Sequence, residues 1–77
     1  MKLTEMRTGS HGIVHDIRGG YGMRRRLAGM GVHPGDSIEV ARASSLRGPM
    51  LIVVHDVQIA IGWRMAMCIE VGEAQAA

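Results

Sequence analysis

The sequence predicts a mainly β protein: a small barrel of about five strands, with one short helix and one or two further helical turns. Three observations lead to this prediction. Eleven glycines and two prolines divide the 77 residues into short segments, as in small β domains with tight turns. Several of these segments alternate apolar and polar residues or form short apolar runs, which is typical of strands. Five strands in so short a chain favour a barrel, which leaves few strand edges exposed.

The N-terminal part is expected to form one helical turn over residues 4–7, with Thr4 as its N-cap. A strand over residues 12–18 follows. The apolar residues of this strand do not alternate regularly, so we expect a β-bulge near His15 and Asp16.

The best helix candidate covers residues 23–30, because three apolar residues are spaced to share one face: Met23, Leu27 and Met30. Residues 19–22 contain three glycines and are predicted to be a flexible loop before this helix. Gly31 is placed to end the helix in the left-handed conformation.

The remaining strands are expected over residues 37–42, 50–55, 59–61 and 69–71. A type II turn at Pro34-Gly35 precedes the first of them. Residues 56–58 are predicted to be a turn, and residues 63–67 one helical turn before the closing strand.

A chain of this length forms one domain, which we place over residues 1–77, with a core region over about 3–72 and a frayed tail at 73–77. Cys68 is the only cysteine, so no internal disulfide can form; we expect a small buried side chain in a reduced, cytoplasmic protein. The periodicities predict a core of ten apolar residues: Ile17, Leu27, Met30, Ile38, Val40, Val53, Ile59, Ile61, Ile69 and Val71.

No catalytic constellation is recognisable, so we expect no enzymatic activity and no cofactor. The glycines at 19–22 match neither a Walker loop nor a dinucleotide fingerprint. No apolar segment is long enough to span a bilayer, and no targeting segment is visible. The four histidines lack the spacing of a metal site, and we expect no high-affinity metal at any of them: His11, His15, His33 and His55.

Positive charge is concentrated early in the chain. Up to Arg26 there are six basic and two acidic residues, and after it three basic and five acidic. The run Arg24-Arg25-Arg26 fits an anionic partner surface, the phosphates of a nucleic acid, or a solvated helix face. Tyr21 and Trp63 are the only aromatic residues, which offers little for base stacking, so we do not expect nucleic-acid binding.

Taken in order, these segments resemble the FeoA family of ferrous iron transport proteins from about Leu3 to Val71. The most specific stretch is Arg-Leu-Ala-Gly-Met-Gly-Val-His-Pro-Gly over residues 26–35. The resemblance implies an SH3-like barrel. The chain departs from the family pattern at three places in its C-terminal half: Gly48, Gly62-Trp63 and Met65.

The resemblance also implies a cytoplasmic accessory or regulatory protein of bacterial ferrous iron uptake, which binds the FeoB membrane transporter on its cytoplasmic part. One alternative is an SH3-like, metal-linked regulatory module of the iron-dependent repressor type, and another is a small nucleic-acid-binding protein. The sequence allows a weak homo-oligomer without fixing the oligomeric state. We expect the partner-binding residues to be Tyr21, Arg24, Arg25, Arg26, Met50 and Trp63.

Overall fold

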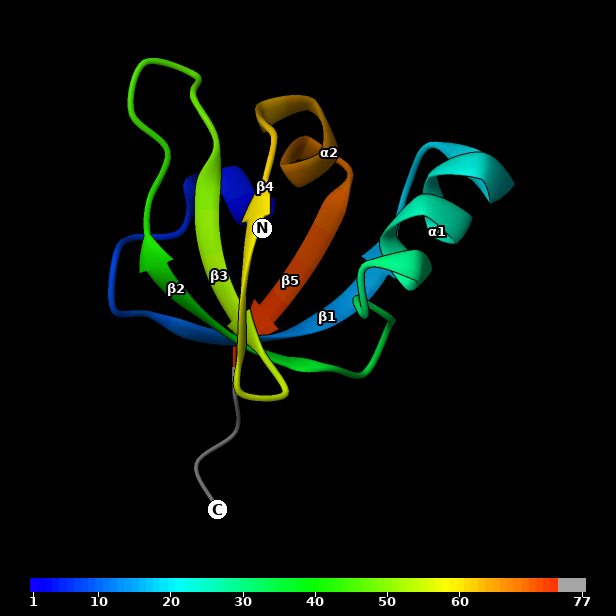
Figure 1. Cartoon of the computed structure of the whole chain (residues 1–77), viewed down its shortest axis with the longest axis horizontal. Coiled ribbons are helices and arrows are strands. Elements are labelled where there is room, and N and C mark those ends of the chain that lie inside the picture. The colour runs from blue at the N-terminus through cyan, green and yellow to red at the C-terminus, as the bar shows by residue number, and fades with distance from the viewer. Residues whose placement is uncertain (74–77) are drawn as a thin grey trace.

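One antiparallel sheet of five strands forms the body of the protein, and the computed structural model describes residues 1–73 (Figure 1). The strand order is β4-β3-β2-β1-β5. The elements along the chain are a 3-10 helix η1 (Leu3–Glu5), β1 (His11–Ile17), α1 (Gly20–Gly29), β2 (Ser37–Arg42), β3 (Met50–Val54), β4 (Val57–Ile61), α2 (Trp63–Met67) and β5 (Ile69–Glu73).

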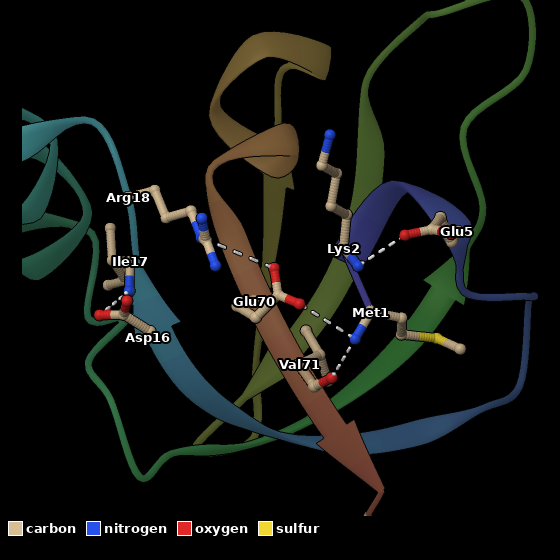
Figure 2. Close-up of polar contacts among 8 residues, drawn as sticks. All are labelled: Met1, Lys2, Glu5, Asp16, Ile17, Arg18, Glu70 and Val71. Carbon is tan, nitrogen blue, oxygen red and sulfur yellow. Dashed lines mark hydrogen bonds and ion pairs between the residues drawn. The ribbon is translucent and has the colours of Figure 1, made fainter.

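Two irregularities bend the sheet. The pairing of β1 with β5 shifts register between Val14 and Asp16, and the pairing of β2 with β3 shifts between Val40 and Arg42. The first confirms the bulge predicted at His15 and Asp16, where the Asp16 carboxylate accepts a 2.9 Å hydrogen bond from the Ile17 N–H (Figure 2). Bulges increase local twist, and the curled sheet has the SH3-like fold that was predicted.

β4 and β5 lie at the two ends of the sheet and are connected through α2. The N-terminal residues add to the outer edge of β5. The Met1 ammonium group donates to the Val71 carbonyl at 2.9 Å, the Val71 N–H donates to the Met1 carbonyl at 2.7 Å, and Lys2 forms a β-bridge with Glu70. The edge of β5 is thus partly occupied by the chain itself (Figure 2).

The core lies inside the curl of the sheet and is entirely apolar. Seven of the ten predicted core residues are buried, while Met30 and Ile59 are partly buried and pack against the core. Val53 was predicted wrongly, because the inward positions of β3 are the alternate ones. The buried residues that were not predicted are Leu3, Met6, Val14, Val32, Met50, Ile52, Val54 and Ala66.

The end of α1 confirms the prediction for Gly31, whose φ is +89°. The Val32 N–H donates to the Leu27 carbonyl at 2.9 Å and the Gly31 N–H to the Ala28 carbonyl at 3.0 Å. This is a Schellman motif, and its two apolar residues, Leu27 and Val32, are both buried. The motif ties the end of the helix to the core.

The starts of α1 and of the first helical turn differ from the predictions. The segment 19–22 is not a loop, because α1 already begins at Gly20, and Gly19 with φ +96° is its N-cap. Thr4 is not the N-cap of the first turn; Lys2 is, and its N–H donates to the Glu5 carboxylate at 2.7 Å.

The hairpin between β3 and β4 turns at His55 and Asp56, both with positive φ, rather than at residues 56–58. This dipeptide lacks the Asn-Gly or Asp-Gly signature that usually marks such a turn.

The closing strand continues to Glu73, whose backbone pairs with Gly12, and the rest of the predicted frayed tail, 74–77, lies outside the described residues. Within residues 1–73, no helix has both the length and the hydropathy needed to cross a membrane.

Candidate partner-binding site

Helix α1 carries four of the six predicted partner-binding residues on its exposed surface. Tyr21 is 69% exposed, and Arg24, Arg25 and Arg26 are all exposed. Tyr21 and Arg25 lie one helical turn apart. The Arg25 guanidinium is 5.8 Å from the centre of the Tyr21 ring, which is within the range of a cation–π contact. We call these four residues the α1 basic face.

Few side chains of α1 pack against the barrel, so most of the helix surface is exposed. Leu27 is its only fully buried residue, and Met23 and Met30 pack partly against the core. Figure 1 shows the helix standing at the side of the sheet, away from the loop between β2 and β3. The basic face is therefore open to a partner.

Met50, the fifth predicted residue, is buried and cannot contact a partner. It begins β3 opposite Ile61, on the inward side of the strand. Because the run from Met50 to Val54 is apolar throughout, its sequence does not show which positions point inward.

Trp63, the sixth predicted residue, is half-buried at the start of α2 and lines a hollow of about 820 Å³. Four cationic side chains from separate segments line the same hollow, and the sequence analysis did not identify them as a group. No local pattern could have done so, because only the fold brings them together. The Trp63 groove, as we call it, is lined by Lys2, Arg18, Arg47, Trp63, Arg64, Met67 and Cys68.

The charges of the Trp63 groove are largely uncompensated. Glu70 lies beside it and is shared between the Met1 ammonium group at 3.2 Å and the Arg18 guanidinium at 3.9 Å (Figure 2). Of the acidic side chains described within residues 1–72, none lies within 4.0 Å of the cationic atoms of Lys2, Arg47 or Arg64. The groove therefore carries a net positive charge.

The groove and α1 meet at one point of the chain. Arg18 is followed directly by Gly19, the N-cap of α1. A Cβ atom on Gly19 would lie 3.4 Å from Cys68 Sγ, so Gly19 lies beside the Cys68 side chain. Cys68 is half-buried rather than buried as predicted.

The histidines lie in two places. His11 and His15 are exposed on β1, and the ring of His15 covers Gly72. His33 and His55 both contact Asp36: His55 Nε2 lies 3.1 Å from Oδ1, and His33 Nδ1 lies 3.4 Å from Oδ2. Among the residues that the structure describes, no three His, Cys, Asp or Glu side chains are placed to hold a metal ion together.

Comparison with known proteins gives the family of the chain. The FeoA domain profile matches residues 1–73. The chain belongs to the FeoA family. A solved structure described as an iron uptake regulatory protein (FeoA) is 39% identical, with 94% of this chain and 93% of the other covered, at a TM-score of 0.84. The solution structure of a FeoA protein from Chlorobium tepidum is 25% identical, with 97% and 71% covered, at a TM-score of 0.84.

The FeoA fold also occurs inside larger proteins. A manganese-dependent transcriptional repressor matches with a TM-score of 0.88 at 21% identity, over 96% of this chain but only 41% of the repressor. This likeness shows a shared fold and nothing further about function. None of the curated protein sequences that were compared matches the chain.

Asp36 links two turns of this FeoA domain. Burial favours its protonated form, but the hydrogen bonds from the His33 N–H and from His55 outweigh burial and place the pKa of Asp36 below its ordinary value. Because the pKa is lower in the folded chain than in the unfolded one, the carboxylate stabilises the fold above roughly pH 4. This stabilisation is lost as the pH falls through the folded-state pKa.

We therefore expect Asp36→Asn to lower the free energy of unfolding at pH 7 by on the order of 1 kcal/mol. The charge-dependent part of this difference should begin to shrink as the pH falls below about 4, where Asp36 takes up a proton in the unfolded chain, and should be lost below the folded-state pKa, where Asp36 is uncharged in both states. Urea unfolding at a series of pH values measures this difference. A difference that stays constant as the pH falls through this range would mean that the charge of Asp36 is unimportant.

Proposed function

We propose that this chain is a cytoplasmic accessory or regulatory protein of bacterial ferrous iron uptake, and that it acts by binding the cytoplasmic part of the FeoB transporter. The observation that carries the proposal is the match to the FeoA domain over residues 1–73, together with the relative described as an iron uptake regulatory protein. That relative aligns over nearly the whole of both chains, so the two proteins share their entire domain.

The surface of the domain supports binding in place of catalysis. The α1 basic face offers three arginines and a tyrosine, and these residue types are enriched at interface hot spots. Their positive charge suits an anionic patch on a partner and would speed association by electrostatic attraction.

Charge reversal tests the α1 basic face. We expect Arg24→Glu/Arg25→Glu to weaken association with the purified cytoplasmic domain of the transporter by more than about tenfold. Both positions are exposed in the middle of α1 and glutamate is a good helix former, so the variant should stay folded, which circular dichroism checks. Calorimetry measures association, and ferrous iron uptake is measured in a strain that depends on this system.

The matched control is Arg7→Glu/Arg42→Glu, which makes the same change of charge at two exposed arginines outside both surfaces. It should leave association within about twofold of wild type. If the α1 variant binds and supports uptake like wild type, the arginines are only a solvated helix face. If wild type itself does not bind the transporter domain, the proposed partner is wrong.

A further inference from the structure

We propose that the Trp63 groove binds an extended, acidic protein segment that also carries an apolar side chain. The groove is a different surface from the α1 basic face. If the segment belongs to the transporter, this proposal rests on the proposed function and extends it. Binding of an acidic peptide in the groove can be measured without the transporter.

The positive charge of the groove favours a ligand that carries acidic side chains. Lys2, Arg18, Arg47 and Arg64 line it, and no acidic residue from the described part of the chain does. Glu70 offsets part of the charge of Arg18 from beside the groove, as Figure 2 shows. The other three cations are left for carboxylates of a ligand, and guanidinium groups are suited to paired hydrogen bonds with carboxylates.

The apolar surface of the groove favours a ligand that carries an apolar side chain beside its carboxylates. Trp63 is half-buried, Met67 is 39% exposed, and both line the groove. Leu46, next to Arg47 in the chain, is 100% exposed. Tryptophan, arginine and methionine together are the composition of a protein–protein interface core.

The turn that carries Leu46 and Arg47 is held in an unusual conformation. Both residues have left-handed backbones, with φ +53° and +59°, a conformation that glycine adopts far more readily. The Gly48 N–H donates to the Ser45 carbonyl at 2.9 Å, and the Ser44 hydroxyl donates to the Gly48 carbonyl at 2.6 Å. These bonds hold the backbone that presents a fully exposed leucine and an arginine of the groove, which lowers the backbone entropy lost on binding.

The same features argue against other ligands. A single-stranded nucleic acid needs successive aromatic platforms, and the groove holds one aromatic residue. The other aromatic, Tyr21, is on α1 and pairs with Arg25. A lone phosphate would make only a few screened contacts with the exposed cations and none with the apolar surface of Trp63 and Met67, whereas an extended segment can contact several cations and that surface together.

Trp63 is the only tryptophan of the chain, so its fluorescence reports on this groove directly. The probe is a short peptide of Glu-Glu-Leu repeats, titrated into the full chain at low salt. We expect a saturable change of Trp63 fluorescence. Binding should weaken by roughly tenfold in about 0.5 M salt, and again by roughly tenfold in Arg47→Gln/Arg64→Gln.

Two controls separate the groove from general electrostatic attraction. Arg7→Gln/Arg42→Gln removes the same charge at two exposed arginines outside both surfaces and should bind the peptide within about twofold of wild type. A peptide of Glu-Glu-Ser repeats keeps the charge of the probe and should bind more weakly. Leu46→Ser should weaken the Glu-Glu-Leu peptide selectively, while circular dichroism shows that the variant is folded.

Absence of saturable binding, or equal loss in the Arg7/Arg42 and groove variants, would overturn the proposal. Tighter binding of oligothymidylate than of the peptide would overturn it in favour of nucleic acid, and saturation by inorganic phosphate alone in favour of a small anion. If the peptide binds as expected while the transporter domain does not, the groove stands and the proposed function fails. If the transporter domain binds and the peptide does not, the proposed function stands and the groove proposal fails.

Discussion

Replacing Leu27 with alanine is expected to destabilise the domain by about 2–5 kcal/mol. Leu27 is 0% exposed and is the one fully buried side chain of α1, and its carbonyl accepts the hydrogen bond from Val32 that ends the helix. A chain of this size has a total stability of only about 4–12 kcal/mol. The substitution therefore removes a large part of it, and the Tm should fall by roughly 10 °C or more.

Leu46→Ala is the matched control, because it makes the same chemical change at a leucine that is 100% exposed. It should alter the free energy of unfolding by less than about 0.5 kcal/mol. Urea and thermal unfolding of both variants give the comparison. Equal stability of Leu27→Ala and wild type would show that α1 is not anchored as described.

The second large effect is expected at Gly12, a buried position of β1. A Cβ atom at this residue would lie 2.4 Å from Val71 Cγ1, 2.9 Å from the Gly72 carbonyl oxygen and 3.2 Å from Met6 Cε. The side chains of Val71 and Met6 could move, but the carbonyl belongs to the paired strand β5. Gly12→Ala must therefore push β1 and β5 apart, and we expect a loss of about 3 kcal/mol or more.

Gly22→Ala is the corresponding control. Gly22 lies in α1, nothing is within 4 Å of where its Cβ would be, and alanine is the better helix former. This variant should be more stable than wild type by about 0.5–1 kcal/mol. If Gly12→Ala and Gly22→Ala both unfold like wild type, the close approach of β1 and β5 is not a constraint on the chain.

The parts of the fold with a clear local pattern could be predicted from sequence. The strand 37–42 alternates regularly and has the predicted bounds, as does the helical turn 63–67. The run Met50–Val54 is apolar at every position, so its inward side is decided by pairing with β2 and β4 and not by any local pattern. The errors at Val53 and Met50 both come from this run.

Of the two candidate surfaces, one could be predicted from sequence and the other could not. The arginines of the α1 basic face are adjacent in sequence and lie on one exposed helix, so their clustering could be predicted. The cations of the Trp63 groove come from separate parts of the chain: Lys2 precedes η1, Arg18 follows β1, Arg47 lies in the β2–β3 loop and Arg64 lies in α2. They lie together only because the sheet curls, and no local sequence pattern indicates that they are close in space.

The occupied edge of β5 limits how copies of this protein can add to one another. Continuous growth of a β-sheet through many molecules requires two free edges on each, one to donate and one to accept. Here Met1 and Lys2 cover part of β5, which leaves β4, a strand without a charged residue, as the more open edge. Two copies could pair β4 with β4 around a two-fold axis, and such a pair would expose only the partly covered β5 edges. Self-association by this route ends at a closed dimer and does not continue into a fibre.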